Sequence, residues 1–207
     1  MRLSIGNEHG FVVGQTRSGK TTLLLRLCAC YPRFVFFDVK HDINSKQLAN
    51  AVVASSPAEA YAYIYEQERE AVIYKPRGAG FKELMKEHDA VCKIAYHAGN
   101  YAIIDDEAAH VCDSNRIGEW HYKCLTMGLA RGVKVITATQ RPVQIHNCAL
   151  SEASWFIMFR LLVESHREKL AGIMPRDVAE GAKTLGEHEF AFWHKDGTYV
   201  RRAKLKL

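Results

Sequence analysis

The stretch of the chain with the clearest chemical potential matches the pattern G-x-x-x-x-G-K-[ST], the phosphate-binding P-loop. It comprises Gly14, Gln15, Thr16, Arg17, Ser18, Gly19, Lys20 and Thr21, and Thr22 follows it. In such a loop, backbone N–H groups at the start of a helix point at the β-phosphate. Lys20 reaches the β- and γ-phosphates, and the Thr21 hydroxyl ligates Mg²⁺. These residues predict a nucleotide-binding site, with ATP and Mg²⁺ as the expected cofactors.

Three consecutive carboxylates form a second group with chemical potential. Asp105, Asp106 and Glu107 follow the apolar stretch 101–104. Beside a P-loop, an aspartate at the end of a strand belongs to the Mg²⁺ shell, and an adjacent glutamate can act as general base toward the attacking water. We assign Asp106 to the metal and Glu107 to the water. Asp105 and Asp106 are the alternative pair for these two roles, because the sequence alone leaves the end of the strand open.

A polar residue at the end of a further apolar stretch forms the third candidate. Residues 133–139 are apolar and β-branched, and they are followed by Gln140, Arg141 and Pro142. In α/β sheets, ligands bind in the crevice at the carboxyl ends of the strands. Gln140 is therefore predicted to sense the γ-phosphate and to relay its loss.

The elements that must position these residues alternate between strands and helices. Strands are expected at 11–13, 34–38, 71–74, 101–105, 133–139, 155–159, 189–193 and 199–203, and helices at 20–30, 45–69, 80–97 and 114–130. Strands joined by helix-length connections predict an α/β fold, a mainly parallel sheet flanked by helices. Asp196-Gly197 signals a hairpin turn. We expect a single domain over 1–207, with a core at about 10–170 and a C-terminal antiparallel extension at about 186–207.

Composition excludes several classes of protein. The 207 residues are 48% hydrophobic and 25% charged, which is ordinary for a globular chain. No apolar run reaches the ~20 residues that a membrane span requires, and no signal-peptide pattern is present, so the protein is expected to stay where it is synthesised. The six cysteines have no CxxC spacing and are expected to be reduced. The net charge of +5 permits a polyanionic partner without requiring one.

Together, these motifs resemble the FtsK–HerA superfamily of DNA-pumping ATPases over about residues 10–170. The P-loop resembles the family's G-x-T-G-S-G-K-[ST], with Arg17 in place of a glycine. Residues 36–42 are similar to its D-x-K-x-D signature, which Asp38 and Lys40 begin, and residues 106–108 fit its D-E-A pattern. Residues 129–133 and 138–142 are similar to its A-R-x-x-G-[IV] and A-T-Q-R-P stretches.

The resemblance implies a fold and a function. The fold is a RecA-like P-loop NTPase of the ASCE type. Because the chain is compact, it resembles in particular the genome-packaging ATPases of membrane-containing icosahedral viruses, including the archaeal turreted type. Such a protein hydrolyses ATP to move double-stranded DNA into a preformed capsid, as a homo-oligomeric ring, pentameric or hexameric, with capsid or vertex proteins as partners. The expected location is the host cytoplasm and the packaging vertex of the virion.

Arginines complete the predicted catalytic set of Lys20, Glu107 and Gln140. In ring ATPases, an arginine of one subunit often stabilises charge in its neighbour's site and accelerates the reaction by ~10³–10⁵. By resemblance, Arg131 is the first candidate for this finger in trans and Arg160 the second, with Arg141 third.

Two further sets of residues carry weaker predictions. Asp38 and Lys40 could form a polar relay beside the P-loop or could end a strand. The basic residues Lys75, Arg77, Lys82 and Lys86 are candidates for contacts with DNA phosphates.

Three other functions remain open from the sequence. A conjugation or chromosome pump usually carries membrane anchors or extra domains. A small P-loop kinase needs an acceptor pocket and usually a lid rich in arginine, and the acidic pair on one strand followed by a strand that ends in Gln140 argues against it. A nucleotide switch that does not hydrolyse would not need Glu107.

Overall fold

The computed structural model describes residues 5–48 and 50–205, and the predicted domain ends at 1–4 and 206–207 lie outside them. One sheet contains every strand of these residues, in the order β3-β4-β2-β5-β6-β1-β7-β8-β9. The strands are β1 (Gly10–Val13), β2 (Phe34–Phe37), β3 (Val52–Ala54), β4 (Ala71–Tyr74), β5 (Ala102–Asp105), β6 (Lys134–Thr139), β7 (Trp155–Phe159), β8 (Glu189–His194) and β9 (Tyr199–Lys204).

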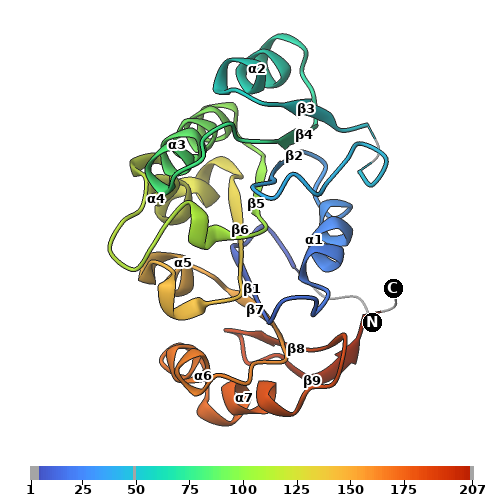
Figure 1. Cartoon of the computed structure of the whole chain (residues 1–207), viewed down its shortest axis with the longest axis vertical. Helices are drawn as coiled ribbons and strands as arrows, with labels where there is room; N and C mark the ends of the chain where they lie inside the picture. Colours follow the sequence, from blue (N-terminus) through green and yellow to red (C-terminus); the bar gives the residue numbers. More distant parts are fainter. Residues whose placement is uncertain (1–4, 49, 206–207) are drawn as a thin grey trace.

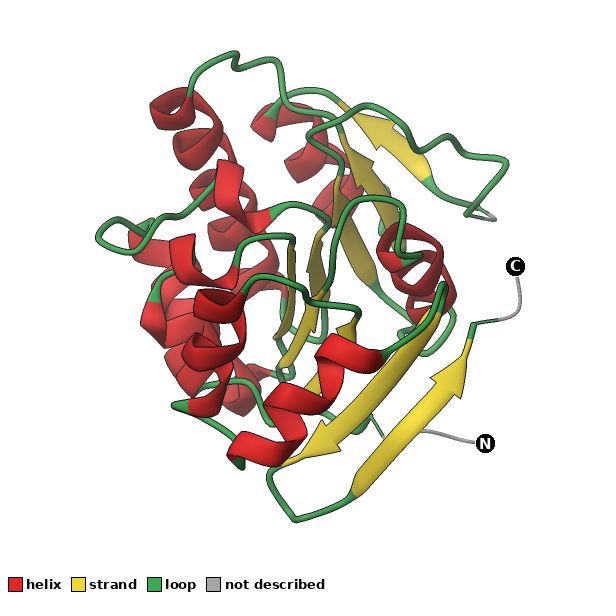
Figure 2. Cartoon of the chain, turned by 60° about the horizontal axis from the view of Figure 1, so that its bottom comes forward, coloured by secondary structure: helices red, strands yellow, loops and turns green. Residues whose placement is uncertain are grey.

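The pairing confirms the predicted fold class. All pairs from β3 to β7 are parallel, and the pairs β7–β8 and β8–β9 are antiparallel. Figure 2 shows the last two strands side by side at one edge of the sheet. This is the mainly parallel sheet with a C-terminal antiparallel hairpin that the alternation of elements predicts.

Helices cover both faces of the sheet (Figure 1). Helix α1 (Lys20–Cys28) packs on one face, and α3 (Phe81–Ala98) and α4 (Glu119–Met127) pack on the other. The remaining α-helices are α2 (Pro57–Tyr61), α5 (Asn147–Ser151), α6 (Glu164–Ala171) and α7 (Arg176–Gly181). Among the described residues, no helix combines the length and the apolar character needed to cross a bilayer.

The predicted helix at 45–69 is wrong. The segment contains strand β3, helix α2 and a π-helix at Ala62–Glu66. Ser56 caps α2, since its Oγ accepts a hydrogen bond from Glu59 N (3.2 Å), and Pro57 occupies the first helical turn. A proline is favoured at this position and disfavoured further along a helix, so the helix can begin only here.

The other elements differ mainly at their ends. The helix expected at 114–130 begins only at Glu119 and continues beyond Met127 as a 3₁₀ turn at Gly128–Arg131. Helices α5, α6 and α7 were not predicted from the sequence. All six cysteines are free in the structure.

The order of the strands determines which residues meet. Strand β6 lies between β1, which leads into the P-loop, and β5, which leads into the carboxylates. Val13 pairs with Thr139, and Asp105 pairs with Thr137, so the three strands end at the same edge of the sheet. Because side chains alternate between the faces of a strand, adjacent residues of β5 pack into the hydrophobic clusters on opposite faces of the sheet. Ile103 packs on the α3 and α4 side, and Ile104 packs on the α1 side.

Candidate nucleotide-binding site

The P-loop joins β1 to α1, and its backbone geometry depends on two glycines. A Cβ on Gly14 would lie 2.5 Å from the Cβ of Phe159, so no larger residue fits there without a shift. Gly19 precedes α1 with a φ of 103°, in the left-handed region that glycine tolerates. Arg17 also has a positive φ, 62°, although it carries a side chain.

Lys20 is the buried cation of the loop. Its Nζ donates hydrogen bonds to the carbonyl oxygens of Gly14 (2.7 Å) and Gln15 (2.9 Å). Burial lowers the pKa of Lys20 to about 8, while the charges of Glu107 and Asp106 act in the opposite direction. Phosphate groups beside Lys20 would favour its charged form further.

Thr21 and Asp106 form an oxygen-rich pair. The Thr21 hydroxyl lies 3.0 Å from each carboxylate oxygen of Asp106. Burial raises the pKa of Asp106, against the opposing effects of Lys40, Thr21 and Lys20. A nearby cation would hold the carboxyl group ionised. Hydroxyl and carboxylate oxygens are the ligands that Mg²⁺ prefers, so this pair fits the metal that a P-loop implies.

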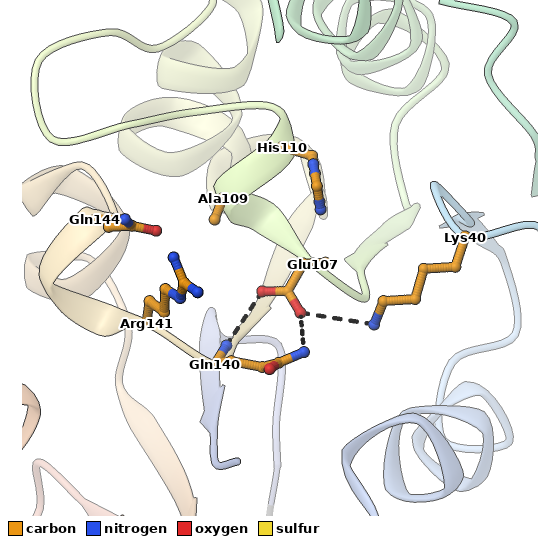
Figure 3. Close-up of a pocket in the computed structure, with 7 residues that line it drawn as sticks. All are labelled: Lys40, Glu107, Ala109, His110, Gln140, Arg141 and Gln144. Atoms are coloured by element: carbon orange, nitrogen blue, oxygen red, sulfur yellow. Dashed lines mark hydrogen bonds and ion pairs between the residues drawn. The ribbon is translucent and has the colours of Figure 1, made fainter. Parts of the chain in front are cut away.

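Glu107 is held by donors from two different elements (Figure 3). Its Oε1 accepts hydrogen bonds from Thr139 Oγ1 (3.3 Å) and from the backbone N–H of Gln140 (3.2 Å). Its Oε2 accepts one from Gln140 Nε2 (2.9 Å) and lies 3.6 Å from Lys40 Nζ. The carboxylate therefore has a defined orientation, and Glu107 lines a cavity of about 300 Å³.

Gln140 also contacts the P-loop. Its Oε1 accepts a hydrogen bond of 2.6 Å from the Thr16 hydroxyl. Lys40 Nζ lies 3.5 Å from Asp106 Oδ2 as well as near Glu107. The polar circuit is the name we give to the closed path Thr16–Gln140–Glu107–Lys40–Asp106–Thr21, which leaves the P-loop at Thr16 and returns to it at Thr21.

Asp105 lies away from the nucleotide loop. It is the last residue of β5 and faces α3 and α4, where its Oδ1 lies 2.7 Å from His88 Nε2. Burial raises the pKa of Asp105, but the charges of His88 and His121 and the His88 hydrogen bond outweigh this effect and leave the pKa lowered. Of the two aspartates that the sequence left open, the structure brings Asp106 to Thr21.

Of the two residues in the predicted polar relay, Lys40 lies beside the P-loop site and Asp38 does not. Lys40 belongs to the polar circuit, whereas the carboxylate of Asp38 accepts hydrogen bonds from the backbone N–H groups of Asp42 (3.2 Å) and Ile43 (2.9 Å). Lys75 Nζ lies 3.7 Å from Asp38 Oδ2. Asp38 therefore stabilises the loop that follows β2, and that loop delivers Lys40.

The arginine candidates lie in different parts of the molecule. Arg131 donates to the carbonyl oxygen of Tyr96 (2.8 Å) and precedes β6, so it lies at the end of the strand opposite to Gln140. Arg160 and Arg17 line one cavity of about 320 Å³ together with Gln15. Arg141 lines the cavity beside Glu107 (Figure 3).

Two residues near the P-loop were missed from the sequence. Thr139 donates to Glu107, and its position as the last residue of β6 could have indicated this. His188 lines a cavity of about 280 Å³ with Arg17 and Lys20, and its Nδ1 lies 3.3 Å from Ser18 O. His188 comes from the turn before β8, and no motif in the sequence signals its position.

Comparison with known proteins shows that the fold is shared with P-loop ATPases. No protein-family model and no curated protein matches the sequence. The structure of the genome packaging NTPase B204 from Sulfolobus turreted icosahedral virus 2 with ATP-gammaS matches with a TM-score of 0.75 at 19% identity, covering 97% of this chain and 98% of that chain. B204, described as the DNA-packaging ATPase from Sulfolobus turreted icosahedral virus, matches with a TM-score of 0.71 at 18% identity, covering 97% and 98%.

A protein of another system shares the core. The pCW3 conjugation coupling protein TcpA, solved with ATPgS, matches with a TM-score of 0.58 at 14% identity, covering 95% of this chain and 60% of that chain. At such identities the likeness establishes a common fold. The predicted P-loop NTPase fold is thereby confirmed.

Proposed function

We propose that this protein is an ATP-hydrolysing motor that translocates double-stranded DNA and packages a viral genome into a preformed capsid. The observation that carries the proposal is the polar circuit, which connects the phosphate loop to a carboxylate suited to activating water. The fold shared over nearly the whole length of a viral genome packaging NTPase supports the packaging role.

The first proposed step is the binding of ATP by residues 14–22. Lys20 and the N–H groups at the start of α1 bind the phosphates. Thr21 and Asp106 would hold Mg²⁺, which would supply stabilisation of negative charge on the phosphate oxygens. Glu107 then accepts a proton from a water molecule that attacks the γ-phosphorus, and the bond to the β-phosphate oxygen breaks to leave ADP and phosphate.

The hydrogen bonds and the ion pair that the Glu107 carboxylate already makes suggest how hydrolysis is controlled. Each of its oxygens already has two neighbours that donate or carry a positive charge. To accept a proton from water, Glu107 must lose at least one of them. Gln140 is the suitable one, because its side chain also bonds to Thr16 and so responds to phosphates in the loop. In this proposal, a γ-phosphate draws Thr16 away, Gln140 turns, and Glu107 becomes available.

The remaining site residues have proposed roles between subunits and toward DNA. Arg131, Arg160 and Arg141 are the candidates, in that order, for a finger that completes the site of a neighbour in a pentameric or hexameric ring. Lys75 and Arg77 already lie near carboxylates, within 3.7 Å and 3.5 Å, whereas Lys82 and Lys86 are exposed on α3. We therefore favour the latter two as contacts for DNA phosphates, which a motor must grip without reading sequence.

The proposal extends to organisation and location. Residues 1–207 form a single P-loop ATPase domain, which acts at a capsid vertex with capsid or vertex proteins as partners. The expected locations are the host cytoplasm and the virion. A conjugation-type pump is the second candidate, because the coupling protein TcpA shares the core of the fold.

One experiment tests the proposal most directly. ATP hydrolysis is measured with and without double-stranded DNA over a range of protein concentrations, with no small-molecule phosphate acceptor present. We expect hydrolysis that rises more steeply than protein concentration, because a ring must assemble, and that increases with DNA. Hydrolysis proportional to protein concentration and indifferent to DNA would refute the motor, and nucleotide turnover only with an added acceptor would indicate a kinase.

A second measurement separates the two kinds of pump. Empty capsids of a candidate virus are added to the DNA-stimulated protein, and protection of DNA from nuclease is followed. Protection that requires ATP and capsids supports packaging. Translocation of DNA without any such protection favours the conjugation-type pump.

A further inference from the structure

A polar cluster lies inside the apolar core on the face of the sheet that α3 and α4 cover, opposite to the face that α1 covers. It consists of His88 from α3, Asp105 from β5 and His121 from α4, and each is at most 1% exposed. The surrounding core contains side chains such as Val91 and Leu125. Buried polar side chains in such a place normally have a partner for every polar atom.

Several atoms of this cluster have no such partner. His88 Nε2 lies 2.7 Å from Asp105 Oδ1, which leaves Asp105 Oδ2 and both ring nitrogens of His121 without a hydrogen bond to the described residues. The nearest approach between the two groups is 3.9 Å, from His121 Nε2 to Asp105 Oδ2. This distance is too long for a hydrogen bond, so the protein itself does not satisfy these atoms.

We propose that His88, Asp105 and His121 bind one Zn²⁺ ion between α3, α4 and the end of β5. Three donor atoms, one from each residue, lie within 4.8 Å of one another. A tetrahedral zinc has its donors at about 2.0–2.2 Å, so two donors are separated by roughly 3.4 Å. His121 Nε2 and Asp105 Oδ2 lie 3.9 Å apart, about 0.5 Å beyond this value. His88 Nε2 lies 2.7 Å from the other oxygen, Asp105 Oδ1, and this hydrogen bond would give way to the metal.

The chemistry of the donors selects the metal. Imidazole nitrogen with one carboxylate suits Zn²⁺, whereas Mg²⁺ takes oxygen ligands. A single ion would satisfy Asp105 Oδ2 and one ring nitrogen of His121 together.

Cys92 is the fourth donor in this proposal, and its Sγ would have to move toward the ion, because only the first three residues have donor atoms within 4.8 Å of one another. It lies one helical turn after His88 on α3, with its Sγ 3.9 Å from His88 Nε2. Zn²⁺ with one carboxylate would keep a net positive charge in the core, which is costly. A thiolate neutralises that charge, and coordination to the metal deprotonates the thiol.

The position of the site gives it a role. Asp105 directly precedes Asp106 and Glu107, so an ion that ties Asp105 to α3 and α4 fixes the end of the strand that presents these two carboxylates. The inference does not depend on the proposed function, because metal binding is measured without nucleotide.

The test begins with metal content. The full chain, without a histidine tag and purified without chelators, is expected to contain a single Zn²⁺ by mass spectrometry of the metal. Replacement by Co²⁺ should give the visible absorption of a tetrahedral site and a thiolate-to-metal charge-transfer band. The metal-free protein should melt roughly 5–10 °C below the same protein in a free zinc concentration of about 100 times Kd.

Two neighbouring carboxylates provide a matched pair of variants. Asp105→Asn and His121→Gln should lose the metal, while Asp106→Asn, which alters the opposite face of the same strand end, should retain it. Equal loss in Asp105→Asn and Asp106→Asn would assign the ion to the P-loop site and overturn the proposal.

A measurement on the unaltered protein keeps the test valid if the variants do not fold. X-ray absorption at the zinc edge should show scattering from imidazole rings and one sulfur. A protein that binds neither Zn²⁺ nor Co²⁺ after reconstitution overturns the proposal, and a spectrum without sulfur overturns the assignment of Cys92.

Discussion

Replacing Arg17 by glycine is predicted to stabilise the protein while weakening its nucleotide binding. Arg17 is exposed and has a φ of 62°, a left-handed conformation. This conformation costs an ordinary residue roughly 1–2 kcal/mol. Glycine avoids that cost but loses about 0.5–1 kcal/mol through the greater freedom of the unfolded chain. The net gain in the free energy of unfolding is about 0.5–1 kcal/mol, or roughly 2 °C in melting temperature.

The same change removes a cation from the predicted phosphate site. Arg17 lines the cavity that also contains Lys20 and Thr21. One unit charge at about 4 Å from another contributes about 1 kcal/mol in water and more near a protein surface. The dissociation constant for ATP is therefore expected to rise about five- to tenfold in Arg17→Gly.

Arg17→Ala is the matched control, because alanine removes the charge and keeps the Cβ that makes a positive φ costly. It should bind ATP as weakly as Arg17→Gly and show no gain in stability. Thermal unfolding without nucleotide and calorimetric titration with ATP at about 0.15 M salt separate the two effects. A gain in Arg17→Ala equal to that in Arg17→Gly, or unchanged ATP affinity in both, would refute the reasoning.

Three further predictions concern the base, the loop and the acid stability. Glu107→Gln should lower kcat for ATP hydrolysis by about 10²–10⁴ and change ATP affinity little, as steady-state kinetics and titration will show; an unchanged kcat rejects the assignment. Gly14→Ala should lose about 1–3 kcal/mol in denaturant unfolding because its Cβ meets Phe159, whereas Gly6→Ala, with open space around it, should not change. Burial lowers the pKa of His9 to about 4, so the unfolded chain binds more protons below pH 6.5, and stability should fall by about 2–3 kcal/mol from pH 6.5 to 4, less steeply in His9→Asn.

The central strands could be predicted because a parallel strand buried on both faces has a continuous apolar sequence. The same continuous apolar sequence left open whether Asp105 or Asp106 is the ligand of the predicted Mg²⁺ ion. Ile103 and Ile104 are both fully buried, so nothing in the sequence distinguishes the two faces of β5. Only the packed structure shows that Asp105 continues the face of Ile103 and Asp106 that of Ile104.

The segment 45–69 illustrates a different failure. It is rich in alanine and other helix formers, and propensity alone favours one long helix. The stronger local signal was Ser56 followed by Pro57, which starts a helix and does not continue one. The residues before it, Val52–Ala54, pair with β4 at the edge of the sheet, and this tertiary contact overrides a weak propensity.

A family pattern could predict that Lys40 and Gln140 have roles in the site. It could not predict which residues they contact. Lys40 reaches the carboxylate of Asp106, 66 residues away, and Gln140 reaches Thr16 across 124 residues. Contacts at such separations depend on the order of strands, which local sequence does not encode. Asp38, in the same signature as Lys40, turned out to hold its own loop.

The charge balance of the site explains why so many arginines border it. Lys40 within the polar circuit and Lys20 beside it oppose the charges of Asp106 and Glu107, so these four charges nearly cancel. ATP with Mg²⁺ would bring a net negative charge to the site. That charge must be met by backbone N–H groups and by cations outside the circuit, where Arg17 lines the cavity of the phosphate loop. In the proposed motor, the rate of hydrolysis would therefore depend on the cations that a neighbouring subunit brings to this border.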